Sequence, residues 1–335
     1  TVFDLNGFFN KSNQNNKVMI IAEVGINHNG ELDLAKKMIK AAKESGADAV
    51  KFQSFQAEKF CDMFLEEEKK VEDVAGGTKS SFAMYKNLEL SKAMHQELLE
   101  EANQLDILLF SSVFDLEMVD ELENLGFPAY KVASSDMTFK PLIERLVQTE
   151  KPLFISTGLG TMDEVIELLT WCKKAEKLVI MHCSSLYPPE DGEVHINVLD
   201  EYRKHFDCVL GYSDHSKNNI VSLAAISKGA KVVEKHFTLD HDLMGPDQDL
   251  SLDPKEFREW VNNIRILEDI LGINQKYPTP REQHIIFNSR RSIRAAHHLK
   301  KGTQLTEKDL LCLKPEKGIS AKYFNKIIGK SLIKN

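Results

Sequence analysis

Short apolar runs alternate along the chain with longer stretches in which apolar residues recur every three to four positions. Most of the short runs are continuously apolar, which is typical of parallel strands covered on both faces. We expect strands at residues 18–24, 48–53, 107–113, 129–134, 152–158, 178–183, 208–214 and 231–237. The pattern therefore predicts a regular succession of strands and helices over most of the chain.

The stretches between these strands carry helical patterns such as "LDLAKKMIKAAKES", "LEMVDELENLG" and "MDEVIELLTWCKK". Another, "NIVSLAAISKG", begins at a pair of asparagines and ends at Gly229, which are typical helix start and stop signals. Eight strands alternating with eight helices predict an α/β fold, a parallel (β/α)8 TIM barrel that the helix ending near residue 272 completes. The alternative is an open, doubly wound sheet, which the strand count and the lack of a Gly-x-Gly-x-x-Gly turn disfavour.

The pattern divides the chain into four parts. We expect an N-terminal extension at 1–17, the barrel at 18–272, a linker with two prolines at 273–288, and a second domain at 289–335. The second domain is small enough to need docking on another surface for robust stability. Residues 54–94 form a long insertion after the second strand, at the end of the barrel where active sites are built.

Net charge, cysteine spacing and the length of the apolar runs limit the classes of protein to which the chain can belong. The net charge is −8, which argues against a nucleic-acid or anionic-membrane surface but leaves room for a local basic pocket. The five cysteines are scattered without a Cys-x-x-Cys pair, as expected for reduced thiols. The first residues lack the features of a secretory signal, and no apolar run approaches the ~20 residues of a membrane span. We expect a cytoplasmic protein.

Polar residues at the carboxyl ends of barrel strands are typical of catalytic sites. The predicted strand ends and the turns after them carry Glu23, Asn27, His28, Lys51, Gln53, Ser111, Ser112, Lys131, Ser134, Ser135, Ser156, Thr157, His182, Ser184, Ser185, Tyr187, Asp214, His215 and His236. Two lysines and several hydroxyls converging on one cavity predict a site for phosphate or carboxylate. His215 and His236 end neighbouring strands, within reach of one divalent ion; the alternative for each is a packed, hydrogen-bonded histidine.

Several motifs together resemble those of the sialic acid synthases, which include N-acetylneuraminate, legionaminate and pseudaminate synthases and spore-coat relatives. The motifs occur in order over nearly the whole chain: "IIAEVGINHNG", "DAVKFQ", "YKVASSD", "STG", "MHCSSLYP", "GYSDHS", "EKHFTLD" and "GPD". The tail "HHLKKGTQLTEKDL" resembles the antifreeze-like (SAF) domain of that family.

The resemblance implies condensation of phosphoenolpyruvate (PEP) with an open-chain N-acylated amino sugar, giving a nine-carbon 2-keto acid and phosphate. It implies that His215 and His236 bind a divalent ion, Mn²⁺ first and Mg²⁺ or Co²⁺ as alternatives, which polarises the sugar aldehyde. Residues matching PEP-contacting positions are Lys51, Ser112, Lys131, Ser134, Ser156, Ser185 and Ser213. Residues matching positions around the sugar are Glu23, Gln53, Tyr187 and Asp247, with Glu23 as the candidate for proton transfer.

The chain departs from the family pattern at three places. Ser112-Val113 stands where Thr-Pro is common, Ser185 stands where Asn is common, and Lys314 stands where the SAF domain usually offers an arginine. In the family this arginine contacts the sugar in the partner subunit, so the resemblance implies a domain-swapped homodimer. Lysine cannot make the bidentate contact of a guanidinium, so the resemblance leaves two types of acceptor open, N-acetylmannosamine and a 2,4-diacetamido-trideoxyhexose.

Two other functions remain open from the sequence. One is a Schiff-base aldolase or lyase that acts on a pyruvate-derived keto acid through Lys51 or Lys131. The other is a non-catalytic sugar-binding barrel, against which the full set of lysines and histidines argues. Borohydride trapping with pyruvate separates the aldolase from a metal enzyme.

Overall fold

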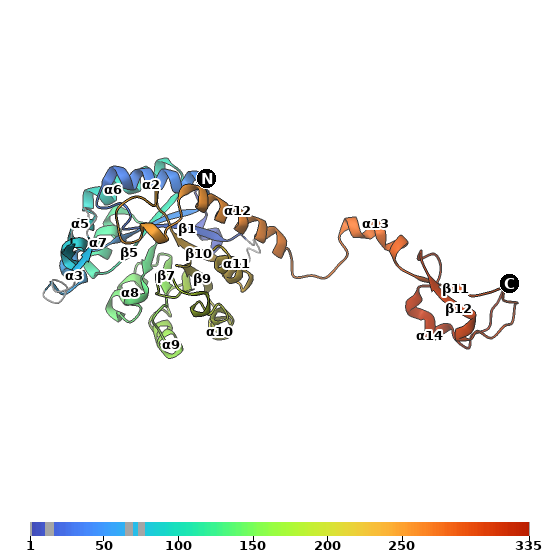
Figure 1. Cartoon of the computed structure of the whole chain (residues 1–335). Coiled ribbons are helices and arrows are strands. Elements are labelled where there is room, and N and C mark those ends of the chain that lie inside the picture. The colour runs from blue at the N-terminus through green and yellow to red at the C-terminus, as the bar shows by residue number, and fades with distance from the viewer. Residues whose placement is uncertain (1, 11–16, 64–69, 73–77, 335) are drawn as a thin grey trace. The chain divides into compact units, whose positions relative to one another are not determined.

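The computed structural model describes residues 2–10, 17–63, 70–72 and 78–334. Its first part is a closed barrel of eight parallel strands in the order β1-β10-β9-β8-β7-β6-β5-β2, so the predicted TIM barrel is confirmed (Figure 1). Pairing of β1 with β10 closes the sheet and excludes the open alternative. The strands are β1 (Met19–Gly25), β2 (Ala49–Ser54), β5 (Leu108–Val113), β6 (Tyr130–Val132), β7 (Leu153–Ser156), β8 (Leu178–His182), β9 (Val209–Asp214) and β10 (Val232–His236).

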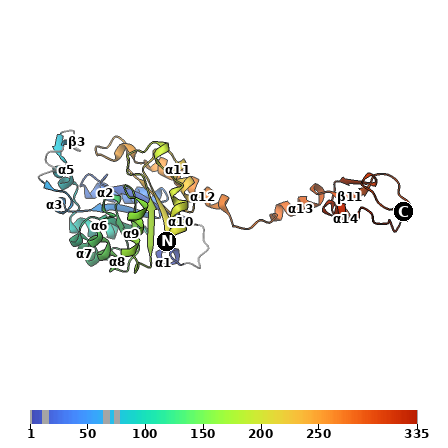
Figure 2. The same cartoon turned by 90° about the horizontal axis from the view of Figure 1, so that it is seen from below.

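Helices surround the strands on the outside (Figure 2). They are α2 (Leu32–Glu44), α6 (Lys92–Gln104), α7 (Leu116–Leu125), α8 (Lys140–Val147), α9 (Met162–Trp171), α10 (Val198–His205), α11 (Ile220–Ser227) and α12 (Pro254–Leu271). Local signals set their ends. For example, Thr161 and Glu164 form a capping box at the start of α9, and Gly126 ends α7 in the left-handed conformation at φ 83°.

Alternate residues of the strands face two separate cores. The outward-facing ones pack under the helices. The inward-facing ones fill the barrel with layers of side chains, as expected for this fold. The inner cluster contains Met19, Ile21, Ala49, Leu108, Phe110, Ala129, Phe154, Val179, Met181 and Val232.

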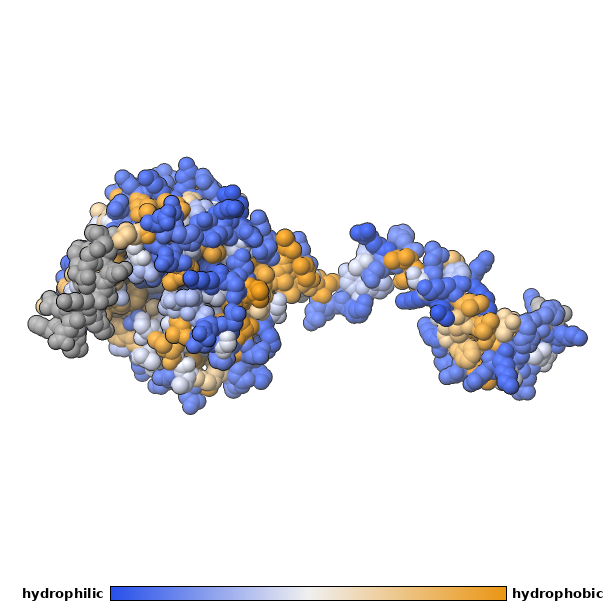
Figure 3. Space-filling model, viewed as in Figure 1, coloured by the Kyte–Doolittle hydropathy of each residue, from blue (hydrophilic) through white to orange (hydrophobic). Residues whose placement is uncertain are grey.

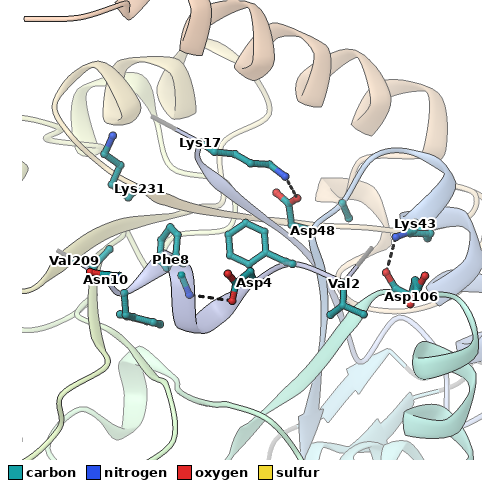
Figure 4. Close-up of a pocket in the computed structure, with 14 residues that line it drawn as sticks. Val2, Asp4, Phe8, Asn10, Lys17, Lys43, Asp48, Asp106, Val209 and Lys231 are labelled. Atoms are coloured by element: carbon teal, nitrogen blue, oxygen red, sulfur yellow. Dashed lines mark hydrogen bonds and ion pairs between the residues drawn. The ribbon is translucent and has the colours of Figure 1, made fainter. Parts of the chain in front are cut away.

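The N-terminal segment covers the amino-terminal end of the barrel. Helix α1 (Leu5–Phe8) and its flanking aromatic residues pack against the inner cluster. A cavity of about 560 Å³ lies beside this segment (Figure 4). Two lysines of its lining contact neighbouring residues. The ammonium of Lys17 lies 3.1 Å from the carboxylate of Asp48, and Lys43 donates a hydrogen bond to the carbonyl oxygen of Asp106. Because this end of a TIM barrel contributes to stability, we do not place the active site here.

The insertion after β2 contains α3 (Ala57–Phe60), β3 (Lys70–Glu72), β4 (Thr78–Ser80) and α5 (Ser81–Leu88). Phe60 and Tyr85 from this insertion pack with Phe55 and Phe114, with ring centres 4.8 Å apart for Phe60 and Phe114. Parts of the predicted insertion, 64–69 and 73–77, lie outside the described residues.

The chain divides into two compact units, Thr1–Gly272 and Ile273–Asn335. The second contains α13 (Pro280–Ser289), the antiparallel pair β11 (Ser292–Ala295) and β12 (Leu310–Leu313), and α14 (Phe324–Ile327). Its core is small and is built on Leu299, Leu305 and Leu310. In the described part of the chain, none of the helices has the length and apolar character needed to cross a membrane.

Candidate active site

The carboxyl ends of the barrel strands present polar side chains to the interior. Since side chains alternate along a strand, the inward positions beyond the apolar cluster fall on residues such as Glu23, Lys51 and Glu234. They line a cavity of about 280 Å³. The lining includes Glu23, Lys51, Gln53, Ser112, Lys131, Ser134, Ser156, Ser185, Tyr187, Ser213, His215 and His236, which are the site residues predicted on the strands and the turns directly after them.

Four charged side chains form a buried network at the base of this cavity. The ammonium of Lys51 lies 2.6 Å from Glu23 and 3.8 Å from Glu234. Lys131 lies 3.1 Å from Glu234, which also accepts a hydrogen bond from Ser213 at 3.0 Å. All four charged groups are almost completely excluded from solvent. Two cations are therefore held in place within a cavity that several hydroxyl groups share.

The two carboxylates have opposite acid–base character. Burial raises the pKa of Glu23 to about 7, although Lys51 opposes the shift. Burial would also raise the pKa of Glu234, but Lys131 and Lys51 outweigh it and lower this pKa to about 2. Carboxylates whose environments separate their pKa values in this way are typical of sites that move protons. Glu23 is therefore suited to gain and lose a proton near neutral pH, while Glu234 stays charged.

The predicted histidine pair lies in the same cavity. The ring centres of His215 and His236 are 5.6 Å apart, and Tyr187 stacks on His215 at 4.1 Å. Nδ1 of His215 lies 2.7 Å from the carbonyl oxygen of Ser184, to which it donates. This bond places the ring lone pair on Nε2, which lies 3.5 Å from the hydroxyl oxygen of Ser213; the hydroxyl donates to Glu234, so Nε2 keeps the lone pair that a metal-binding histidine uses.

The two imidazoles of His215 and His236 are suited to bind a divalent ion. Burial lowers the pKa of His215 to about 4 and that of His236 well below its usual range, so both imidazoles are neutral at physiological pH. Nδ1 of His236 is also buried, and the described part of the chain offers it no hydrogen-bond partner. Two imidazoles bound to one ion at about 2.1 Å have ring centres roughly 5 to 6 Å apart, which the observed separation satisfies.

Elsewhere in the described part of the chain, one group brings three potential metal-ligand atoms together: His241, Asp253 and Glu256. Asp253 and Glu256 form the capping box of α12, and His241 lies 2.9 Å from Glu256. Helix capping accounts for both carboxylates. We therefore assign no metal site to this group.

Comparison with known proteins places the chain in a family. Residues 38–276 match the model of the NeuB family, and residues 290–335 match the model of the SAF domain. The chain belongs to the NeuB family. The predicted relationship to the sialic acid synthases and the predicted SAF domain are both confirmed.

Named relatives agree with this placement over most of the chain. An N,N'-diacetyllegionaminic acid synthase of Legionella pneumophila is 38% identical, covering 94% of this chain and 90% of that protein. The human N-acetylneuraminate-9-phosphate synthase is 35% identical, covering 94% and 88%. A crystal structure of N-acetylneuraminic acid synthetase from Leptospira borgpetersenii has a TM-score of 0.74 at 30% identity, covering 81% of this chain and 91% of that one. The NeuB-family chain is therefore an enzyme of the sialic acid synthase type, as predicted.

The serine-rich side of the cavity is tightly packed. Ser134 accepts a hydrogen bond from the backbone N–H of Gly158 at 3.0 Å and lies 3.0 Å from the thiol of Cys183. A Cβ atom at Gly158 would lie 2.3 Å from the hydroxyl oxygen of Ser185. The buried hydroxyl of Ser156 has no hydrogen-bond partner among the residues that the structure describes. Only glycine at position 158 leaves enough space for these side chains.

The sequence pattern missed one charged residue of the site and included others that face away from it. Glu234 was not predicted, although it lies two residues before His236 and therefore on the same face of β10. Cys183, Phe114 and Leu159 also line the cavity without having been predicted. Several polar residues of the predicted strand ends and turns lie outside the lining: Asn27, His28, Ser111, Thr157, His182, Ser184 and Asp214.

Several of these residues make hydrogen bonds within or around the barrel wall. Ser111 hydrogen-bonds Ser54, and Thr157 hydrogen-bonds Tyr202 at 2.8 Å. His182 contacts the carbonyl of Val194 at 2.9 Å. Ser111 thus joins two strands of the barrel wall, while Thr157 and His182 join the wall to residues outside it. Strand-end position alone therefore does not identify the side chains of the NeuB-family site.

Two other predicted site residues lie outside the lining. Asp247 lies in the turn after β10, next to the short helix Gln248–Leu250, and burial raises its pKa to about 6. Lys314 is exposed and directly follows β12 in the second unit. The cavity of the first unit thus contains neither residue.

Proposed function

We propose that this NeuB-family enzyme condenses PEP with an open-chain N-acylated amino sugar, forming a nine-carbon 2-keto acid and phosphate. The acceptor is N-acetylmannosamine or a 2,4-diacetamido-trideoxyhexose. The observation that carries the proposal is the presence of a paired-lysine network and a neutral histidine pair in one cavity. The first suits the anionic groups of PEP, and the second suits an ion beside the sugar aldehyde.

PEP would bind at the lysine and serine side of the cavity. Lys51 and Lys131 supply fixed positive charge, and the unpartnered hydroxyl of Ser156 supplies a donor. Ser112, Ser134, Ser185 and Ser213 complete the proposed contacts, with Ser112 already 2.9 Å from Lys51. These groups would hold C3 of PEP toward the histidine pair and exclude competing water.

His215 and His236 would hold the divalent ion, for which we propose Mn²⁺, with Mg²⁺ or Co²⁺ as alternatives. When bound, the ion supplies Lewis-acid polarisation of the aldehyde oxygen. Gln53, Tyr187 and Asp247 are the proposed sugar contacts in the barrel. Of these, Gln53 and Tyr187 line the cavity.

Glu23 is the proposed proton carrier. A C–C bond forms between C3 of PEP and the aldehyde carbon, whose oxygen takes up one proton. Water then adds at C2, and the ketone forms as the C2–O bond to phosphate breaks. Of the two protons that the water loses, one balances the proton taken up by the aldehyde oxygen and the other leaves with the phosphate. With a pKa of about 7 and a hydrogen bond from Gln53 at 3.3 Å, Glu23 can accept and return a proton during these steps.

We also propose a domain-swapped homodimer in which Lys314 contacts the sugar bound by the partner subunit, with residues 273–288 as the linker. The second unit exposes apolar side chains that a partner would cover, including Phe287, Leu311 and Leu313. Figure 3 shows a further apolar patch at the end of α12, where Ile266 and Ile270 are exposed. The five cysteines are scattered along the sequence without a Cys-x-x-Cys pair, and we propose a cytoplasmic location on this ground.

The test is incubation with PEP, Mn²⁺ and a panel of N-acyl hexosamines, followed by phosphate release and by mass spectrometry of the product. We expect one acceptor to give phosphate and a nine-carbon keto acid in equal amounts, with loss of both in EDTA. The His236→Ala variant is the matched negative control. Phosphate release from no acceptor would contradict the proposal, and a pyruvate adduct trapped by borohydride on Lys51 or Lys131 would favour the aldolase.

A further inference from the structure

A buried ion pair lies in the barrel wall directly behind the histidine pair. Asp214 and Lys235 are each 1% exposed, and Lys235 Nζ lies 2.9 Å from Asp214 Oδ2. The two residues are register partners on β9 and β10. Neither lines the cavity, but Asp214 directly precedes His215 and Lys235 directly precedes His236. The pair therefore joins the two strands at the positions next to the two imidazoles.

Every hydrogen-bonding group of this pair is used. Lys235 donates to Asp214 and to the carbonyl oxygens of Ser216 and Asn218, at 2.6 and 3.3 Å for the carbonyls. Asp214 accepts from the N–H and the hydroxyl of Ser216 at 2.9 and 2.6 Å, and from the hydroxyl of Ser222 in α11 at 2.5 Å. An ammonium has three donors and a carboxylate about four acceptor sites, so both groups are saturated.

These bonds fix the turn that carries His215. Asp214, before the histidine, and Ser216, after it, are both bound to Lys235. The imidazole itself is held by the carbonyl of Ser184 and by the ring of Tyr187. Because its backbone is fixed from outside the barrel, the ring of His215 has little freedom to move relative to His236.

Stability alone does not account for such a pair. A buried ion pair often adds no more stability than apolar residues of the same size, because burial removes hydration from both charges. Fixing a geometry is the better-supported use of buried charges. Here the geometry that is fixed is the separation of two neutral imidazoles.

We propose that the Asp214–Lys235 pair is a positioning device that sets the separation of His215 and His236 and thereby the affinity of the site for a divalent ion. This inference rests on the proposed function, in which the two histidines bind that ion. Asp214, Lys235 and Ser216 touch neither substrate nor metal and act through the backbone of the two strands.

The experiment measures the dissociation constant of Mn²⁺ by electron paramagnetic resonance, together with unfolding in urea, on the full chain. The double variant Asp214→Asn/Lys235→Met removes both charges, so no unpaired charge stays buried, and Ser216→Ala removes only one hydroxyl. We expect Mn²⁺ to bind 10- to 100-fold more weakly in the double variant, the usual effect of losing support behind a ligand, and several-fold more weakly in Ser216→Ala.

The control is Arg265→Met, which breaks the ion pair with Asp48, 2.6 Å long, at the opposite end of the barrel. It should lower stability but leave Mn²⁺ affinity within about twofold. Wild-type affinity in the folded double variant and in Ser216→Ala, with binding abolished in His236→Ala, would overturn the positioning role alone. Equal Mn²⁺ binding by the wild type and His236→Ala would overturn the metal role of the proposed function and this inference with it.

Discussion

At the scale of single residues, the site combines groups of the same type in different environments. Glu23 and Glu234 both contact Lys51, yet only Glu234 also contacts Lys131. The second lysine keeps Glu234 ionised, while burial dominates at Glu23 and brings its pKa to about 7. The contact with Lys131 and the hydrogen bond from Ser213 therefore distinguish the fixed anion Glu234 from the proton carrier Glu23.

Replacing Glu23 by Gln should remove proton transfer and keep the shape of the cavity. We expect kcat to fall by roughly 10²- to 10⁴-fold, the usual contribution of a positioned acid–base group. PEP binding should persist because Lys51 and Lys131 remain. Steady-state kinetics measure kcat, and a titration with PEP measures the dissociation constant of PEP. An unchanged kcat would exclude Glu23 as the proton carrier.

Gly158→Ala should weaken PEP binding. Its Cβ would lie 2.3 Å from Ser185, 2.7 Å from Cys183 and 2.8 Å from Ser134, so these side chains must move within the proposed phosphate contacts. We expect at least a tenfold rise in KM for PEP. Gly192→Ala is the matched control, since no atom of the described residues lies within 4 Å of a Cβ built at this position. Equal KM values for the two variants would show that Ser134 and Ser185 do not contact PEP.

At the scale of elements, continuous apolar runs were enough to predict the eight barrel strands and their order as a closed sheet. Strand ends likewise indicated most of the cavity lining. It was harder to predict which side chains point into the barrel and which point toward the helices, because an error of one residue along a strand exchanges the two faces. Ser111 and Ser112 are adjacent at one strand end, yet only Ser112 lines the cavity. Glu234 was missed because it precedes the strand end by two residues.

Helix α6 gives a prediction for pH. His95 in this helix contacts Ser54 of β2 at 2.7 Å, and burial lowers its pKa to about 4. The unfolded chain, with a histidine pKa near 6.5, therefore binds more protons between pH 6.5 and 4. Stability should be lost as the pH falls through this window, and His28, with a pKa also lowered to about 4 by burial, adds to the loss.

His95→Gln should make the free energy of unfolding less dependent on pH between 6.5 and 4. Urea unfolding at several pH values measures the slope. His205→Gln on α10 is the control, because His205 is largely exposed. If His95→Gln has the wild-type slope, the buried imidazole of His95 is not a source of the pH dependence.

At the scale of the whole molecule, the sequence motifs separated a barrel from an SAF domain, and the family comparison supports both. The sequence could not define how the two units assemble, and the role proposed for Lys314 depends on that assembly. Its side chain is exposed in the second unit. The proposed domain swap assigns it to the partner's site.

Mixing two variants tests this assignment. His236→Ala removes a proposed metal ligand, and Lys314→Ala removes the proposed contact to the partner's sugar. A mixed dimer contains one site with both residues intact, so mixing after subunit exchange should restore up to about a quarter of wild-type activity. Activity measured before and after exchange decides this; no gain on mixing would show that Lys314 does not act across the dimer.

The central claim is that two imidazoles beside the lysine network bind one divalent ion. Anomalous diffraction at the manganese edge, from crystals grown with Mn²⁺, tests it most directly. We expect a single strong peak about 2.2 Å from a ring nitrogen of both His215 and His236. A peak at His241, Asp253 and Glu256 with none between the two cavity histidines would contradict it.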